Sequence, residues 1–130
     1  MRTITPSLLI TDDDIDFRET LKEVFEPRGF RAFTAGDGEE ALEIVHRESV
    51  HLILLDMHMP RLTGLETIIR LRQEKSRLPC ILISAALNDG IVEQARKADV
   101  YSVLSKPIRF REITEIVSEA MHTTYEWYGN

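Results

Sequence analysis

The hydrophobic positions of this chain follow two alternating patterns. Short apolar runs of strand length occur at residues 7–11, 30–35, 51–55, 80–84 and 100–104. The third and fourth runs are almost continuous leucine and isoleucine, which is typical of strands buried on both faces of a parallel sheet. These runs predict five strands.

Between the runs, apolar residues repeat every three or four positions, which predicts amphipathic helices. The predicted apolar faces are Phe17, Leu21, Val24 and Phe25; Ala41, Leu42 and Val45; Leu65, Ile68 and Ile69; Ile91, Ala95 and Ala98; and Phe110, Ile113, Val117 and Ala120. Pro27 and Gly29 are expected to end the first helix. Asn88 or Asp89 is expected to cap the fourth, and the fifth is expected to end near Met121.

Strands and helices thus alternate strictly along the chain. This order predicts an α/β fold with a doubly wound parallel sheet, right-handed crossovers and helices on both faces. In such a sheet, functional side chains gather beyond the carboxyl ends of the strands, near the topological switch point.

Composition and charge narrow the possible functions. The 130 residues fit one domain, and a net charge of -6 argues against a surface for nucleic acid or anionic membranes. The single Cys80 excludes an internal disulfide and a cysteine-rich zinc site. No apolar stretch is long enough to span a bilayer, and MRTITPS at the start does not resemble a signal peptide. We expect a cytoplasmic protein that binds neither nucleic acid nor membranes.

Polar residues with reactive side chains follow four of the five predicted strands. Asp12, Asp13 and Asp14 follow the first strand, Asp56 the third, Ser84 the fourth and Lys106 the fifth. Each has an ordinary explanation when taken alone, such as a helix N-cap for Asp14 or a turn residue for Asp56. Their joint position at one edge of the sheet favours a functional site.

The chemistry of these residues suggests phosphoryl transfer. Several carboxylates at close range form a site for a hard cation, of which Mg²⁺ is the common cellular example. An aspartate can act as a nucleophile and form an acyl phosphate. Asp56 is the best nucleophile candidate, because it stands alone after a buried strand. Lys106 and the Ser84 hydroxyl would stabilise the charge on the phosphoryl oxygens.

These motifs together resemble the receiver domain of the two-component response regulators. The matching residues are the pair Asp12-Asp13, the segment DMHMPRLTG from Asp56 to Gly64, the pair Ser84-Ala85 and the pair Lys106-Pro107. The resemblance covers essentially the whole chain. It implies a flavodoxin-like (βα)5 fold with strand order 2-1-3-4-5, over residues 1–122, followed by a tail or linker at 123–130.

The resemblance also implies a function. A sensor histidine kinase or a phosphotransfer protein would donate a phosphoryl group to Asp56 in a Mg²⁺-dependent reaction. The change would be transmitted through the fourth helix, fifth strand and fifth helix to an effector or to a second copy in a homodimer. The protein would not be an enzyme beyond its own phosphorylation and slow autodephosphorylation.

Individual roles follow from the same resemblance. Asp13 and Asp56 would bind Mg²⁺ through their side chains, Asp12 mostly through water, and His58 through its backbone carbonyl. Lys106 would pair with the phosphoryl group and would precede a cis peptide bond to Pro107. Ser84 would move to bond the phosphoryl oxygen.

Two positions depart from the family pattern. Val103 stands where the family usually has a Tyr or Phe that turns inward with the Ser or Thr. Tyr101, two residues earlier, would point the same way as Val103 on a strand; we expect the aromatic part of the switch to be absent. His58 and Ala86 border the path of an attacking water, but we interpret the His58 imidazole as an exposed loop side chain without a role.

Two alternative functions stay open at the level of sequence. A phosphatase of the haloacid dehalogenase type also uses an Asp-x-Asp motif after an apolar strand, and Asp12 and Asp14 fit that spacing. That family requires a further acidic motif after the lysine, and Asp56 would then have no role. A receiver that binds proteins without being phosphorylated is the second alternative, although Asp13, Asp56 and Lys106 are all retained.

Overall fold

A computed structural model describes residues 5–129. Residues 1–4 and Asn130 lie outside the described residues. The first four belong to the start that does not resemble a signal peptide, and Asn130 belongs to the expected tail. None of the helices in the described part of the chain is long and apolar enough to cross a membrane.

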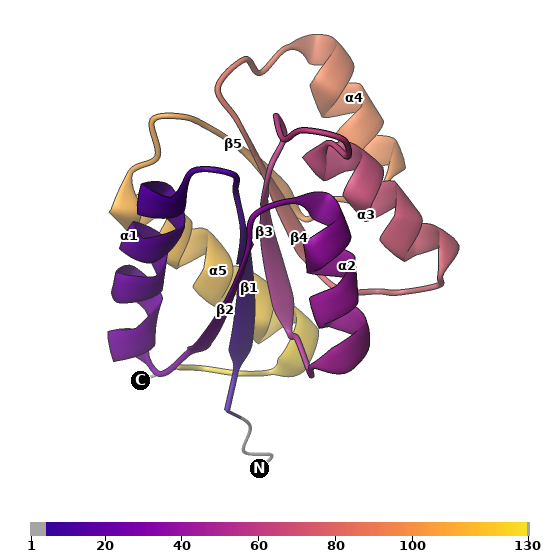
Figure 1. Cartoon of the computed structure of the whole chain (residues 1–130). Helices are drawn as coiled ribbons and strands as arrows, with labels where there is room; N and C mark the ends of the chain where they lie inside the picture. Colours follow the sequence, from indigo (N-terminus) through magenta and orange to yellow (C-terminus); the bar gives the residue numbers. More distant parts are fainter. Residues whose placement is uncertain (1–4, 130) are drawn as a thin grey trace.

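Five parallel strands form one sheet in the order β2-β1-β3-β4-β5, as expected. The elements along the chain are β1 (Ser7–Thr11), α1 (Ile15–Phe25), η1 (Glu26–Arg28), β2 (Arg31–Ala35), α2 (Gly38–Arg47), β3 (Leu52–Asp56), α3 (Gly64–Gln73), β4 (Cys80–Ser84), α4 (Asp89–Lys97), β5 (Ser102–Ser105) and α5 (Phe110–Tyr125). Helices α1 and α5 cover one face of the sheet, and α2, α3 and α4 cover the other (Figure 1).

The core consists of two apolar layers, one on each face of the sheet. Residues on β1 alternate between them: Leu8 and Ile10 pack in the layer beneath α1 and α5, and Leu9 packs in the layer beneath α2, α3 and α4. The strands β1, β3 and β4 are buried along their whole length, which explains their lack of polar alternation. Cys80 lies in this core, where burial raises the pKa of its thiol to about 12, so it acts as a small apolar residue.

Side-chain caps fix where the helices begin. Asp14 accepts hydrogen bonds from the backbone amides of Asp16 and Phe17 and is the expected N-cap of α1. Asn88 caps α4 by accepting from the Ile91 amide. Each cap satisfies a backbone donor that the first helical turn leaves unpaired.

Some predicted details are wrong. Ile69 and Phe110 were expected on buried helical faces, but they are 41% and 52% exposed. Ile69 lies next to Ile68, which does face the core, and Phe110 is the first residue of its helix, so periodicity alone could not show that they are exposed. Strand β5 begins at Ser102, two residues later than expected, and α5 continues to Tyr125 instead of ending near Met121.

The C-terminal residues fold back on the domain. The Tyr125 hydroxyl donates a hydrogen bond to the backbone carbonyl of His51, at 2.6 Å. The Trp127 ring packs edge-on against Phe30, with ring centroids 5.1 Å apart, and belongs to the layer beneath α1 and α5. The tail therefore closes the apolar layer at the edge of the sheet opposite the carboxyl ends of the strands (Figure 1).

We predict that Trp127→Ala lowers the free energy of unfolding by about 1–3 kcal/mol, less than a fully buried aromatic residue would because Trp127 is only partly enclosed. Urea denaturation measures the change. Tyr128→Ala is the matched control, because Tyr128 is 74% exposed and its loss should change stability by less than about 0.5 kcal/mol. Equal effects of the two substitutions would contradict the role of the Trp127 contact.

Candidate functional site

The carboxyl ends of β1, β3, β4 and β5 bring the predicted site residues to one edge of the sheet. Backbone hydrogen bonds continue the ladder just beyond the strand ends and hold the residues there. The Asp12 amide donates to the Ala35 carbonyl at 3.1 Å, and the Lys106 amide donates to the Ser84 carbonyl at 2.9 Å. Asp56 is the last residue of β3 and pairs with Ile83 of β4. The sheet itself therefore sets the spacing of the site.

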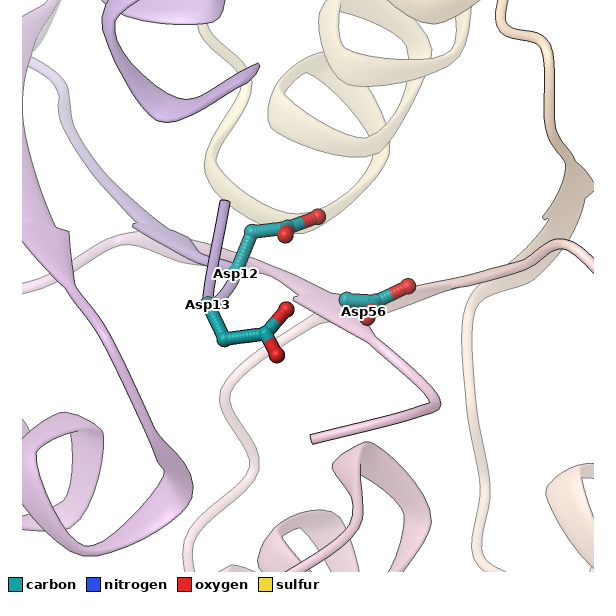
Figure 2. A group of neighbouring side chains, drawn as sticks. All are labelled: Asp12, Asp13 and Asp56. Atoms are coloured by element: carbon teal, nitrogen blue, oxygen red, sulfur yellow. The ribbon is translucent and has the colours of Figure 1, made fainter. Parts of the chain in front are cut away.

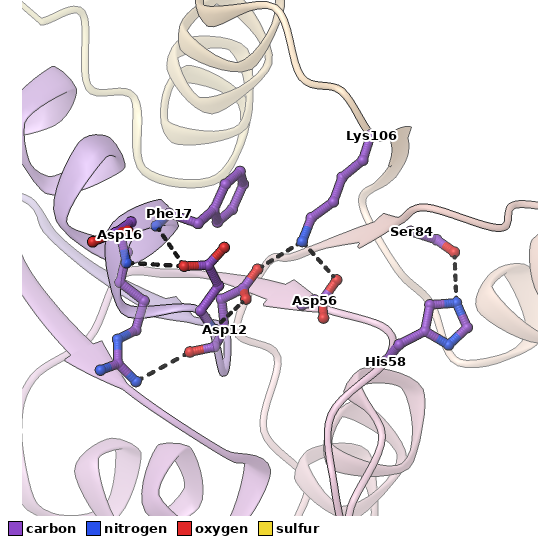
Figure 3. A network of polar contacts seen from close by, with 9 residues as sticks. Asp12, Asp16, Phe17, Asp56, His58, Ser84 and Lys106 are labelled. Carbon is purple, nitrogen blue, oxygen red and sulfur yellow. Dashed lines mark hydrogen bonds and ion pairs between the residues drawn. The ribbon is translucent and has the colours of Figure 1, made fainter.

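Lys106 joins two carboxylates from different strands. Its ammonium lies 2.9 Å from Asp12 Oδ2 and 3.2 Å from Asp56 Oδ1 (Figure 3). Asp12 and Asp56 are buried, at 1% and 5% exposure. The ammonium also lies 4.4 Å from the centre of the Phe17 ring, a distance that allows a cation–π attraction.

Burial and charge act on these groups in opposite directions. Burial raises the pKa of Asp56 above its ordinary value, the negative charge of Asp12 raises it further, and Lys106 opposes both. Burial alone would lower the pKa of Lys106, but the hydrogen bond and charge of Asp12, followed by those of Asp56, outweigh it and raise that pKa. The lysine therefore stays charged, and its positive charge stabilises the ionised form of Asp56.

Asp12, Asp13 and Asp56 form a carboxylate cluster (Figure 2). One oxygen from each lies within 4.8 Å of the others. Oxygens on opposite sides of a Mg²⁺ ion are about 4.2 Å apart, because each bond is about 2.1 Å. The longest separation in the cluster is thus at most about 0.6 Å greater than this span, and hard oxygen donors suit this ion. Asp13 is exposed while the other two are buried, which leaves room for water ligands.

Asp14 lies outside this cluster. Its carboxylate accepts from the amides of Asp16 and Phe17 at 3.0 and 3.3 Å and so caps α1. Asp12 and Asp14 therefore do not converge as the paired carboxylates that the phosphatase alternative requires. The Asp14 amide instead donates to Asp12 Oδ1 at 2.9 Å and helps to orient the Asp12 side chain.

The β3–α3 loop depends on a glycine at its end. Gly64 donates its amide to the Met57 carbonyl at 3.0 Å. A Cβ at Gly64 would lie 2.3 Å from the backbone oxygen of Asp56, so a side chain there would displace Asp56 or the loop. This contact gives the last glycine of the DMHMPRLTG segment a physical reason.

Ser84 and His58 form a second polar contact at the same edge. The Ser84 side chain is fully buried, and its Oγ lies 3.2 Å from His58 Nε2 (Figure 3). The Ala86 amide donates to the same Oγ at 3.1 Å. His58 is exposed, as expected, but its imidazole makes a contact with Ser84 that the sequence did not predict. Ala85, the next residue after Ser84, is also exposed and makes the turn away from the strand.

The remaining predicted residues are placed by β5 and its flanking turns. The Lys106–Pro107 peptide bond is cis, as expected. Val103 packs in the layer beneath α3 and α4, whereas Tyr101 packs in the opposite layer and its hydroxyl donates to Glu119 of α5. The expectation that Tyr101 points the same way as Val103 is wrong, because Tyr101 precedes the strand and does not follow its alternation.

Sequence patterns missed two contacts that shape the site. Phe17 was placed on the core face of α1, and its ring also lies beside the Lys106 ammonium. Arg18 donates from Nη1 to the backbone carbonyl of Asp12 at 3.1 Å. Both residues lie on the first turn of α1, one helical turn beyond the aspartates. Whether their side chains reach the site at the edge of the sheet depends on the direction of the helix.

The family model for the response regulator receiver domain matches residues 8–118. The chain is 41% identical over 111 residues to the transcriptional activator protein PfeR of Pseudomonas aeruginosa, covering 84% of this chain and 35% of PfeR. It is 30% identical over 112 residues to the sporulation initiation phosphotransferase F of Bacillus subtilis, covering 86% of this chain and 90% of that protein. It is 37% identical over 108 residues to the transcriptional regulatory protein CpxR of Escherichia coli, covering 82% of this chain and 45% of CpxR.

Solved structures have the same fold. A CheY-like response regulator receiver domain protein from Methanospirillum hungatei matches with a TM-score of 0.90 at 20% identity, over 95% of this chain and 98% of that one. A response regulator receiver protein from Pseudomonas putida matches with a TM-score of 0.86 at 27% identity, over 91% and 99%. The chain belongs to the response regulator receiver family. It spans about a third to a half of the length of PfeR and CpxR.

We predict that Lys106→Met destabilises the protein by about 2–3 kcal/mol near neutral pH, because two buried carboxylates lose their shared cation. The pKa of Asp56 would then rise further, so the folded state would bind a proton more tightly than the unfolded state. The loss of stability caused by Lys106→Met should therefore become smaller as the pH falls toward the ordinary carboxyl pKa of about 4. Urea denaturation at several pH values measures it. Lys97→Met, on the exposed side of α4, is the control, and a pH-independent deficit would contradict the explanation.

We predict that Asp13→Ala raises the Mg²⁺ dissociation constant at least about tenfold, since losing even an indirect metal contact commonly has that effect. Calorimetric titration of Mg²⁺ measures the constant. Asp13 is exposed, so the fold should be unaffected. Asp16→Asn removes a neighbouring exposed charge outside the cluster and should leave the affinity within about twofold. Equal affinities for the wild type and Asp13→Ala would show that the cluster is not the ion site.

Proposed function

We propose that this chain is the phosphorylation-activated switch of a two-component system, with Asp56 as the phosphoacceptor. One observation carries the proposal: Asp56 is a buried carboxylate with a raised pKa, bound by Lys106 and next to the Asp12 and Asp13 carboxylates. A carboxylate so enclosed is more basic than an exposed one, and so is the better nucleophile, while the nearby cation keeps it ionised.

The proposed reaction transfers a phosphoryl group from a phosphohistidine. An oxygen of the Asp56 carboxylate attacks phosphorus and forms a new P–O bond. The P–N bond breaks, and its electron pair leaves with the donor imidazole, which takes up a proton. Lys106 then pairs with a phosphoryl oxygen, and the Ser84 hydroxyl donates to another. These groups neutralise charge that the buried edge of the sheet would otherwise hold unpaired.

The metal site would be made by the side chains of Asp13 and Asp56, by Asp12 through water and by the backbone carbonyl of His58. A Mg²⁺ ion bound there would supply positive charge to the phosphoryl oxygens. The exposure of Asp13 supports this assignment, because a phosphoryl group needs free positions on the ion.

The proposed donor is a sensor histidine kinase or a phosphotransfer protein. Two large apolar side chains beside the site support a protein partner: Ile15 at the start of α1 is 62% exposed and Phe110 at the start of α5 is 52% exposed. Exposed apolar residues at the rim of a polar site are typical of protein docking. Cytoplasmic location, with no nucleic acid or membrane bound by this domain, belongs to the same proposal.

The proposed output face consists of α4, β5 and α5. Ala95 is the one buried residue of α4 between Asp89 and Lys97. Few buried contacts therefore hold this helix in place, and its displacement costs little free energy. An effector or a second copy of the chain would bind to the shifted face. We propose residues 1–122 as the receiver unit, with 123–130 as a tail whose Tyr125 and Trp127 pack back on it.

We predict that the wild-type protein, incubated with acetyl phosphate, gains the mass of one phosphoryl group only when Mg²⁺ is present. Asp56→Asn should abolish the gain, because an amide oxygen is a poor nucleophile. Intact-mass spectrometry measures both. Asp99→Asn is the matched control, since Asp99 is exposed, lies at the other edge of the sheet and has a φ of 58° that Asn adopts readily.

Three outcomes would overturn the proposal. Full labelling of Asp56→Asn would show that another residue is the phosphoacceptor. No labelling of folded wild-type protein would favour a receiver that binds partners without phosphorylation. Steady release of phosphate from a simple monoester, with no labelled protein, would restore the phosphatase alternative.

A further inference from the structure

The hydroxyl of Ser84 is held by partners on one side before any phosphoryl group is present. Its Oγ contacts His58 Nε2 at 3.2 Å (Figure 3). It also accepts a hydrogen bond from the Ala86 amide at 3.1 Å. Among the described residues, no hydrogen bond joins this hydroxyl to Asp56. The hydroxyl and the phosphoacceptor therefore belong to separate polar contacts, although they follow adjacent strands of the sheet.

A serine hydroxyl has one proton to donate and two lone pairs. The Ala86 amide occupies one lone pair. If the imidazole Nε2 is an acceptor, it takes the only proton; if Nε2 carries a proton, it occupies the second lone pair. In both tautomers His58 takes bonding capacity that a phosphoryl oxygen would need, or fixes the direction of the hydroxyl.

The usual aromatic partner of this hydroxyl movement is missing here. Val103 is aliphatic and packs beneath α3 and α4, and Tyr101 lies in the opposite layer bound to Glu119. His58 is thus the side chain in contact with the Ser84 hydroxyl among the residues that the structure describes. It is exposed, so it can leave without disturbing the core.

We propose that His58 is a positioning residue that holds the Ser84 hydroxyl in its unphosphorylated position, and that phosphorylation must break this hydrogen bond. The inference rests on the proposed phosphoacceptor function of Asp56. It assigns the imidazole to the resting state of the switch, so its removal favours the activated arrangement. The shift is limited to the free energy of one hydrogen bond between neutral groups.

The first test measures the affinity of the protein for beryllofluoride, a phosphoryl mimic, in the presence of Mg²⁺ at one fixed pH. His58→Ala should bind it roughly 3- to 10-fold more tightly than the wild type, as expected from the loss of one competing hydrogen bond. In the Ser84→Ala background, the same substitution should have no effect, because the hydroxyl is absent. His58→Gln can keep the contact through its amide and should restore an affinity close to the wild type.

His46→Ala is the matched control, because His46 is exposed and contacts Glu74 away from the site. A second readout needs no phosphoryl mimic: the ¹⁵N chemical shift of His58 Nε2 should change in Ser84→Ala and stay unchanged in Ser49→Ala.

The outcomes separate this inference from the function on which it rests. Normal beryllofluoride binding by the wild type, with an unchanged affinity in His58→Ala, would overturn the role of His58 alone. An equal gain of affinity in the Ser84→Ala background would also overturn it, since the effect would then not pass through the hydroxyl. A wild type that binds no beryllofluoride and takes no phosphoryl group would overturn both the function and the inference.

Discussion

A single ammonium between two buried carboxylates sets the arrangement of the whole site. Asp12 and Asp56 come from neighbouring strands, so the sheet forces their charges together. Lys106 comes from β5, which is three strands away from β1, or about 14 Å at the usual strand spacing. Only a long, flexible cation can reach both carboxylates from there. The lysine therefore ties three strands together at the edge where the chemistry occurs, and Phe17 supports its ammonium from below.

The charges of this edge are balanced only in part. Three carboxylates and one ammonium leave a net charge of -2 (-3 + 1), which a divalent cation would neutralise. In the proposed function, a Mg²⁺ ion would balance this charge, and a phosphoryl group would add negative charge at the same edge. Ser84 stands apart from this balance because its hydroxyl is directed to His58. In the unphosphorylated site, the ion pairs of Lys106 and the contacts of the Ser84 hydroxyl are separate, and phosphorylation would join them.

Local patterns predicted what depends on neighbouring residues in the sequence. The strands at 7–11 and 80–84 were predicted to the residue because they are unbroken apolar runs. The site residues were found because parallel strands end at one edge. The His58–Ser84 contact could not be predicted, since it joins the β3–α3 loop to the end of β4, and their approach depends on the sheet. The packing of Tyr101 on the opposite layer followed from where β5 begins, which no residue pattern marks.

Helix α5 is anchored at its C-terminal end. It follows the Lys106–Pro107 turn at the site and runs for 16 residues, about 24 Å, to the opposite edge of the sheet. There Tyr125 bonds to the backbone of His51, and Trp127 packs against Phe30. Because its C-terminal end is anchored, α5 can tilt but cannot move along its own axis. Any displacement that Lys106 passes to α5 must therefore be a tilt, largest beside the site and smallest near the tail.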